Sequence, residues 1–359
     1  LNFLQGKRFQ QIWCVDFEFG QSSNLTPEVR CLVAREYYSG QLVQLWLDGV
    51  AKPACPFPLG ENSLYIAYYA SAEMGCHLAL DWDLPNFIID LFCEFRCQTN
   101  GLKLPVKNNL LGALSIHSLE HIPLVEKEEM RELALRGGPY STAEKLALLD
   151  YCQTDVDALV ALLSKMAPEI SIDHALIRGH YMQAVARMES VGIPVDLPLL
   201  ESLRVGWDSI QDDLIADVDK DFGVYEGRTF KSELFTQYLN RNQISWPRLD
   251  SGYLDLQDQT FRSMAKIYPQ LSPLRELRHS LGQMRLKEFK VGADGRNRTL
   301  LSPFRSKTGR NQPSNSRYIF GSSVWLRGLI KPAEGWGIAY IDWSQQEFGI
   351  AAALSGDEA

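Results

Sequence analysis

The sequence predicts an α/β domain with a mixed β-sheet, followed by a mainly α-helical segment and a short α+β region. Three observations support this prediction. Strand-like runs between residues 11 and 48 give way to alternating helical and strand patterns. Helical periodicity dominates from residue 174, and from residue 292 it is replaced by a stretch rich in Gly, Ser, Asn and Arg. The expected parts are residues 1–170, 171–290 and 291–359.

The expected strands of the first part are rich in Val, Ile, Trp, Tyr and Phe. They are residues 11–19, 29–38, 41–48 and 87–92. Ser39-Gly40 supplies a tight turn between two of them. A meander of strands that then alternates with helices is typical of a mixed sheet.

Helical spacing of apolar residues is clearest over residues 137–166, where Ser141 and Glu144 form an S-x-x-E capping box. Shorter helices are expected near residues 70–81, 108–116 and 125–136.

The pattern is interrupted over residues 167–173, which marks the first boundary. A long helix then begins at His174 and breaks at Gly192 and Pro194. A further helix is expected over residues 272–290. Near the end, a strand over residues 336–342 and a following helix are expected.

Composition excludes some classes of protein. The sequence has no apolar run long enough to span a membrane and no leader, so we expect a cytoplasmic protein without a membrane partner. Its first residue is Leu, which suggests a fragment or a processed chain. The seven cysteines are odd in number and form no C-x-x-C pair, so we expect reduced thiols.

Charge is unevenly distributed along the chain. A net charge of −8 argues weakly against nucleic-acid binding. Residues 296–331, however, contain basic side chains and no Asp or Glu. The basic residues are Arg296, Arg298, Arg305, Lys307, Arg310, Arg317, Arg327 and Lys331. This stretch favours a phosphate-binding surface, although a solvated basic loop would have the same composition.

Two pairs of residues and one further acid are candidates for chemistry. Asp16 and Glu18 are two apart in an apolar strand, so both face the same way and would hold Mg²⁺ or Mn²⁺ between them. A solvated acidic strand face is the alternative. Tyr151 and Asp155 share one helix face, although Tyr151 could be core and Asp155 surface. Glu73 lies in the first turn of a helix, where an acid usually complements the helix dipole.

In this order, the motifs over residues 8–166 resemble those of the DEDD superfamily of 3′–5′ exonucleases, in its Tyr-containing subclass. The resemblance implies an RNase H-like fold. It also implies that Asp16, Glu18 and Asp155 bind two divalent metal ions, Mg²⁺ or Mn²⁺. Tyr151 would orient the attacking water, and Glu18 would contact the terminal 3′-hydroxyl.

The second motif departs from that family, which usually has Asp at the position of Glu73. The alignment rests on the downstream "IIDLF", whose Asp90 matches a family Asp. Glu73 is one methylene longer, and it could reach a metal ion or weaken that site. Asp90 is expected to cap a helix or to hydrogen-bond within the scaffold rather than to act in catalysis.

From residue 175 the sequence resembles family A DNA polymerases of the DNA polymerase I group, with phage-type proteins as the nearest match. "AVARMESVGIPVD" is similar to the helix that opens the polymerase domain. "FKSELFTQYLNRNQI" and "LRELRHSLGQMR" are similar to its thumb. "TGR" and "YIDWSQQEFGIAAALSGD" are similar to the segment before the palm and to motif A.

The resemblance implies a role for each matching residue. Asp342 would bind a metal ion, Ser344 and Gln345 would lie near the nucleotide, and Glu347 would be the steric gate against ribose. Arg310 would reach the primer terminus. The other basic residues that would contact DNA are among Arg310, Arg327, Arg305, Lys307 and Arg317. Motif A departs from the family pattern at Trp343, Gln346 and Phe348-Gly349.

The fingers helix and the second palm carboxylate of family A lie beyond motif A and are not in this sequence. We therefore expect the N-terminal part of a replicative or repair polymerase, with a proofreading exonuclease, a thumb and an incomplete palm. The chain alone would not polymerise, and a second polypeptide could supply the rest. The alternatives are a stand-alone 3′–5′ exonuclease that grips DNA and a non-catalytic DNA-binding remnant.

Overall fold

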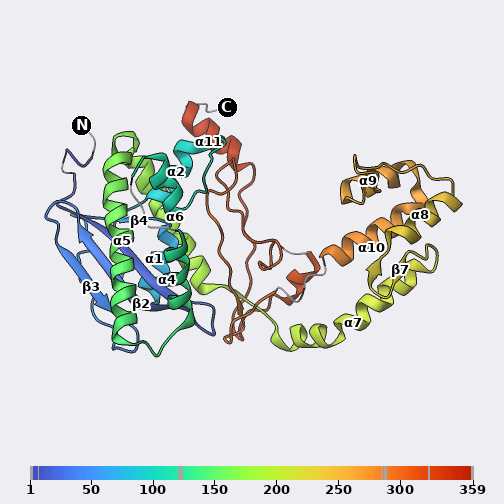
Figure 1. The fold of residues 1–359 in the computed structure, drawn as a ribbon, viewed down its shortest axis with the longest axis horizontal. Helices are drawn as coiled ribbons and strands as arrows, with labels where there is room; N and C mark the ends of the chain where they lie inside the picture. The colour runs from blue at the N-terminus through green and yellow to red at the C-terminus, as the bar shows by residue number, and fades with distance from the viewer. Residues whose placement is uncertain are drawn as a thin grey trace.

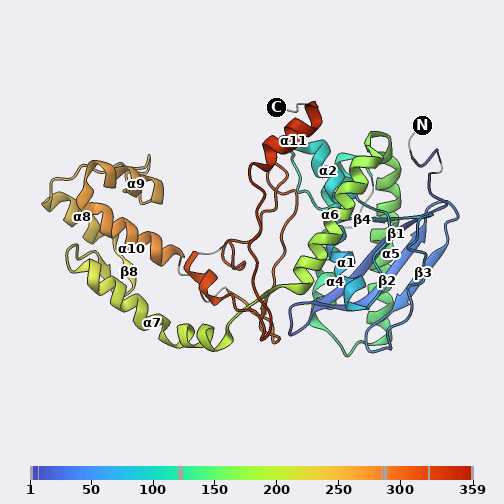
Figure 2. The same ribbon diagram turned by 180° about the vertical axis from the view of Figure 1, so that it is seen from behind.

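The computed structural model of the chain describes residues 3–6, 8–119, 124–283, 286, 289–321 and 324–356. The molecule is elongated, with a β-sheet and its helices at one end and a helical lobe at the other (Figures 1 and 2). A region of long loops and the start of helix α7 connect the two ends (Figure 1).

The predicted mixed sheet is confirmed. It has five strands in the order β3-β2-β1-β4-β5. β1 pairs antiparallel with β2 and parallel with β4, β2 pairs antiparallel with β3, and β4 pairs parallel with β5. The strands are β1 Gln11–Gln21, β2 Pro27–Glu36, β3 Leu42–Trp46, β4 Ser63–Ala67 and β5 Ile88–Asp90.

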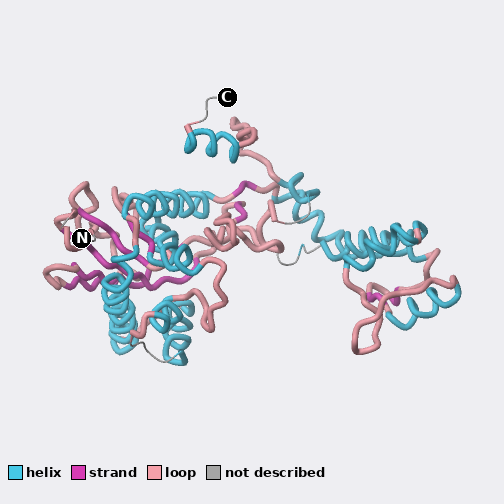
Figure 3. The backbone as a smooth tube through the Cα atoms, turned by 90° about the horizontal axis from the view of Figure 1, so that it is seen from above, coloured by secondary structure: helices cyan, strands magenta, loops and turns pink. Residues whose placement is uncertain are grey.

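Helices cover both faces of the sheet (Figure 3). They are α1 Ala70–Ala79, α2 Leu91–Thr99, α3 Leu110–Ile116, α4 Leu124–Arg136, α5 Thr142–Met166 and α6 Ile172–Val191. The side chains of β1 point alternately to the two faces of the sheet, which explains this arrangement. Ile12 and Cys14 face a core that contains α5, whereas Val15 and Phe17 face a second core that contains α1. The central strand is therefore buried from both sides.

Local signals fix two helix starts. The predicted capping box of α5 is confirmed, since Ser141 accepts from the backbone of Glu144 and Glu144 accepts from the backbone of Ser141. The strand expected over residues 87–92 is wrong in its second half. It ends at Asp90, whose carboxylate accepts from the N–H of Phe92 and starts α2.

The segment after α6 is mainly helical, as predicted. α6 ends at Gly192, where a φ of 64° breaks the helix as expected. The helical lobe has a small β-hairpin and a core in which Phe235 and Phe261 pack with Trp246. Its elements are α7 Leu197–Asp219, β7 Tyr225–Glu226, β8 Thr229–Phe230, α8 Ser232–Arg241, α9 Asp258–Ile267 and α10 Ser272–Gln283. The helix expected over residues 272–290 lies partly outside the described residues.

The last part contains mostly loops. Its regular elements are the short β-pair β6 Ile193–Pro194 with β9 Arg296–Asn297, the 3-10 helix η4 Val324–Leu329 and α11 Gln346–Ser355. The strand expected over residues 336–342 is wrong. These residues form no strand, and Tyr340 is 91% exposed. Without a neighbouring strand, an isolated extended segment has no partner for its backbone groups.

α11 follows this segment, buries none of its described residues and projects from the rest of the molecule (Figure 3).

All seven cysteines are free thiols, in agreement with the sequence prediction. None of the described helices has the length and apolarity needed to cross a bilayer.

Candidate metal centre

Three of the predicted site residues meet at the centre of the sheet. Asp16 and Glu18 project from one face of β1, and Asp155 projects from α5, which packs on that face. One carboxylate oxygen from each residue lies within 4.8 Å of the others. The sequence showed separately that Asp16 and Glu18 share a strand face and that Asp155 lies on a helix. The fold brings these three acids into one group.

The negative charge of the group is only partly compensated, by Lys127. Burial, followed by the charge of Asp155, raises the pKa of Asp16 to about 7. Burial and then the charge of Asp16 raise the pKa of Glu18 well above its usual range. Carboxylates forced together in this way are stabilised by a cation between them, and hard oxygen donors suit Mg²⁺ or Mn²⁺. The donor set therefore fits a divalent metal ion.

Tyr151 lies one helical turn before Asp155, and its side chain is almost fully buried. Its hydroxyl hydrogen-bonds to the Asp155 carboxylate. Burial and then the charge of Asp155 raise the pKa of the phenol. Tyr151 therefore stays protonated and can act only as a neutral hydroxyl at this site.

Cys152 also belongs to the site, although no sequence pattern predicted it there. Its thiol lies 3.3 Å from the Asp16 carboxylate oxygen Oδ2 and donates a hydrogen bond to it. Cys152 is fully buried, and burial raises the pKa of its thiol. It therefore supports the position of Asp16 as a neutral donor.

Glu73 lies beside the group of three acids and outside it. β1 pairs with β4 only from Gln11 to Cys14, so the β1 edge beyond Cys14 has no strand beside it. The Glu73 carboxylate, from α1, accepts a hydrogen bond there from the backbone N–H of Phe17. Its other oxygen, Oε2, is buried without a hydrogen-bond partner. Burial and the charges of Asp16 and Glu18 raise the pKa of Glu73.

Asp90 has the scaffold role that the sequence predicted. Its carboxylate accepts hydrogen bonds from the N–H groups of Tyr69, Ala70 and Phe92 at 2.8–2.9 Å. These bonds tie the start of α1 to the start of α2. Burial raises the pKa of Asp90 to about 6.

Sequence reasoning missed a cation in this site. Lys127 of α4 places its ammonium nitrogen Nζ 2.5 Å from Asp155 Oδ2. The same nitrogen lies 5.5 Å from the centre of the Tyr151 ring. In the sequence, Lys127 stands among glutamates in "VEKEEM", a composition typical of a solvated helix face.

A cavity of about 380 Å³ opens near the carboxyl ends of β4 and β5. We call it the aromatic–arginine cavity. Its lining residues are Tyr68, Tyr69, Phe92, Arg96, Asn108, Asn109, Leu110, Ser302, Pro303 and Arg305. Cys14 pairs with Ile66 in the last paired position of β4, and Tyr68 comes two residues later. Tyr68 packs on the α5 side of the sheet, which is the side of the acids, whereas Phe92 packs on the α1 side.

The predicted polymerase residues of motif A are exposed. Asp342, Ser344, Gln345 and Glu347 are all solvent-exposed. Within the described part of the chain, Asp342 belongs to no group of three potential metal ligands. Glu347 forms an ion pair with Arg310, so the structure brings these two predicted residues together.

The basic stretch divides into exposed and structural arginines. The side chains of Arg305, Lys307, Arg317 and Arg327 are exposed, and that of Arg327 lies over the Phe320 ring.

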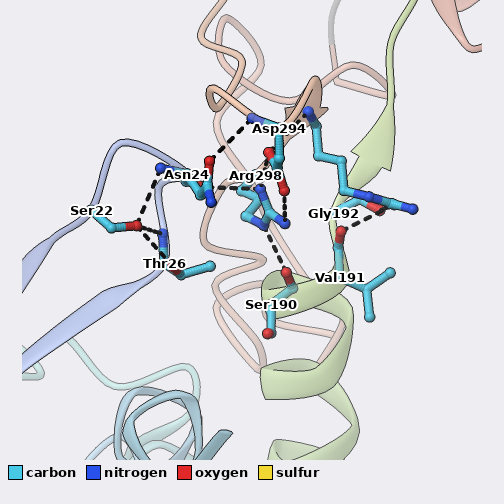
Figure 4. Close-up of polar contacts among 9 residues, drawn as sticks. Ser22, Asn24, Thr26, Ser190, Val191, Gly192, Asp294 and Arg298 are labelled. Atoms are coloured by element: carbon cyan, nitrogen blue, oxygen red, sulfur yellow. Dashed lines mark hydrogen bonds and ion pairs between the residues drawn. The ribbon is translucent and has the colours of Figure 1, made fainter. Parts of the chain in front are cut away.

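Arg298 is different, because its side chain is only 8% exposed. It pairs with Asp294 and donates to the carbonyls of Asn24 and Ser190 (Figure 4). Arg296 donates to the carbonyls of Val191 and Gly192. These two arginines join the loop before β9 to the end of α6, and Arg298 extends the link to the β1–β2 turn. The expectation that they form a free phosphate-binding surface is therefore wrong.

Solved structures similar to this chain include the polymerase domain of Pol1 from M. smegmatis, in complex with a DNA primer-template and a dNTP. The TM-score is 0.62 at 16% sequence identity, and the match covers 99% of this chain. The chain therefore has a DNA polymerase fold. It spans 61% of the Pol1 chain. No protein-family model matches the sequence, and no curated protein matches it.

Proposed function

We propose that the chain is a two-metal 3′–5′ exonuclease joined to the first part of a DNA polymerase I-like, family A polymerase of the phage type. Residues 1–170 would be the RNase H-like exonuclease, residues 171–290 the thumb and residues 291–359 the start of the palm. The observation that carries the proposal is the group formed by Asp16, Glu18 and Asp155, with the hydroxyl of Tyr151 on Asp155.

The residues of the site suit hydrolysis of a phosphodiester. Asp16, Glu18 and Asp155 would hold two Mg²⁺ or Mn²⁺ ions. When bound, such ions activate a water and stabilise the leaving 3′-oxygen. Tyr151 would orient the attacking water through its neutral hydroxyl, and Glu18 would also contact the terminal 3′-hydroxyl. Glu73 would act through β1, because it hydrogen-bonds to the backbone between Asp16 and Glu18.

The aromatic–arginine cavity supports a single-stranded DNA end as the substrate. Aromatic side chains stack on bases of any sequence, and guanidinium groups bind phosphates. Tyr69 and Phe92 line it with ring centres 4.9 Å apart. Arg305 lines the same cavity with an exposed side chain, and Arg96 supports it by donating to the carbonyls of Phe304 and Arg305.

The polymerase assignment rests on the DNA polymerase fold and on the resemblance at motif A. Asp342 would be a metal ligand of the complete palm, Ser344 and Gln345 would lie near the nucleotide, and Glu347 would be the sugar gate. Arg310, paired with Glu347, would reach the primer terminus. Template-directed transfer needs a second palm carboxylate. We therefore predict that the 359-residue chain does not extend a primer. A second polypeptide carrying the missing parts stays a prediction.

The test compares Asp16→Asn with Asp150→Asn on a 5′-labelled single strand in Mg²⁺ or Mn²⁺. Asp150 is an exposed carboxylate on the same helix as Asp155, so its replacement controls for a change of charge. Wild type and Asp150→Asn should shorten the strand from its 3′ end, and Asp16→Asn should not. Equal shortening by Asp16→Asn would show that the site is assigned wrongly.

A non-catalytic DNA-binding remnant is the second candidate, because Glu73 lies outside the group of three acids. That candidate predicts DNA binding without shortening in either metal.

A further inference from the structure

Lys127 is the cation of the acidic site. Its ammonium contacts Asp155 at 2.5 Å, and its positive charge acts on Asp16 and Glu18 as well. Among the residues that the structure describes, three carboxylates share this lysine, so its charge balances only part of theirs. The ammonium of Lys127 contacts Oδ2 of Asp155. A divalent ion held by Asp155 would compete with it for that oxygen.

The location of Lys127 allows it to move. α4 packs against β1 and α5, which places the backbone of Lys127 beside the site. The Lys127 side chain remains 24% exposed, whereas that of Asp155 is 10% exposed. The Lys127 side chain is therefore more open to solvent than that of its partner Asp155. A lysine head group sits on a flexible four-carbon stem, so it can change partner without movement of the helix.

Metal binding would change the partner of Lys127. Two like charges at contact distance repel strongly in a partly buried site. A divalent ion on the Asp155 carboxylate would therefore displace the ammonium from that oxygen. If the site acts on DNA 3′ ends, the phosphate next to that end would be an anion available to the displaced ammonium.

We propose that Lys127 is a further active-site residue, which neutralises Asp155 in the metal-free protein and binds the phosphate next to the DNA 3′ end once metal and DNA are present. This inference rests on the proposed exonuclease function. A cation placed on the reacting phosphate stabilises the negative charge that develops during in-line displacement. Lys127 thus keeps the acids together before the metal binds and contributes to catalysis afterwards.

The alternative is that Lys127 only holds α4 against α5. Three variants separate the two roles. Lys127→Met removes the charge and keeps most of the side-chain volume. Lys127→Arg keeps the charge. Lys165→Met removes an exposed lysine from the end of α5, far along the helix from Asp155, and serves as the control.

The first readout is Mn²⁺ binding by calorimetry at pH 8.5, where protons compete little for the carboxylates. Lys127→Met should bind Mn²⁺ more tightly than wild type by about tenfold, because a competing cation is gone. Lys127→Arg and Lys165→Met should bind it like wild type. Unchanged affinity in Lys127→Met would overturn the counter-ion role, whether or not the protein degrades DNA.

The second readout is the affinity for a single-stranded oligonucleotide in Ca²⁺, measured by fluorescence anisotropy. Lys127→Met should bind about tenfold more weakly, as expected for one charge-assisted phosphate contact. Lys127→Arg should restore binding. If wild type degrades DNA and Asp16→Asn does not, but Lys127→Met matches Lys165→Met in affinity and rate, this inference fails while the proposed function stands.

Discussion

The carboxylate of Glu73 accepts a hydrogen bond from the backbone N–H of Phe17, the residue between Asp16 and Glu18 on β1. This bond closes the strand edge that β4 leaves open, and it places a fourth acid, buried and carried by α1, beside the group of three. The expected second-motif acid is therefore linked to the other acids through the strand that carries two of them.

Replacement of Glu73 by Gln or Ala separates its two effects. Glu73→Gln keeps an oxygen that can accept from Phe17, so the free energy of unfolding should change by less than about 1 kcal/mol. Glu73→Ala leaves the buried N–H of Phe17 unpaired and should cost about 1–3 kcal/mol. Urea unfolding measures both. Equal destabilisation by the two variants would contradict this role of the hydrogen bond.

Removal of metal should lower thermal stability. Because Asp16, Glu18 and Asp155 repel one another, Mn²⁺ that binds the folded chain should raise its melting temperature, and a chelator should reverse the rise. Asp155→Asn should abolish most of this response, and Asp150→Asn should keep it. Differential scanning calorimetry with and without Mn²⁺ makes the comparison. A full response in Asp155→Asn would place the metal elsewhere.

Glu189 of α6 should make stability depend on pH. It accepts from the N–H of Leu301 at 2.6 Å, and burial raises its pKa from about 4.5 to about 7. Across this window the folded carboxyl keeps its proton while the unfolded one has lost it. The folded state then binds more protons, so the free energy of unfolding falls as the pH rises from about 4.5 to about 7.

Glu189→Gln keeps the hydrogen-bond acceptor and removes the ionisation. As the pH rises from about 4.5 to about 7, the free energy of unfolding of wild type should therefore fall relative to that of Glu189→Gln. Unfolding curves at several pH values measure it. A difference that is constant with pH would mean that Glu189 is ionised in the folded protein.

Arg305 lines the aromatic–arginine cavity with its side chain exposed. Arg305→Ala should weaken single-stranded DNA binding for all sequences and reduce the slope of log affinity against log salt by about 1. Arg241→Ala, on the exposed surface of the helical lobe, is the control. Salt titrations of DNA binding test this prediction. Identical slopes for the two variants would show that Arg305 does not contact the DNA.

The acids of the site could be expected from the sequence because their spacing has local meaning. Period 2 puts Asp16 and Glu18 on one face of a strand, and a spacing of four puts Tyr151 and Asp155 on one face of a helix. Lys127 could not be found in this way. Its partner is 28 residues distant in the chain, and only the packing of α4 on α5 brings the two together.

In the sheet, too, some strands could be predicted from local sequence and others could not. β1 to β3 have clear strand composition, whereas β4 is a five-residue apolar run that periodicity cannot distinguish from a piece of helix. Residues 336–342 have strand composition but no neighbouring strand, and they form no regular structure and stay exposed. Composition indicates what a segment can form, and pairing decides whether it does.

The central claim is that the chain removes nucleotides from DNA 3′ ends at Asp16, Glu18 and Asp155 and does not extend them. The most direct measurement incubates the purified chain with a 5′-labelled primer on a template, Mg²⁺ and dNTPs, beside the same reaction without dNTPs. The account predicts metal-dependent shortening in both reactions, which is absent in Asp16→Asn, and no product longer than the primer. Primer extension, or shortening that persists in Asp16→Asn, would contradict it.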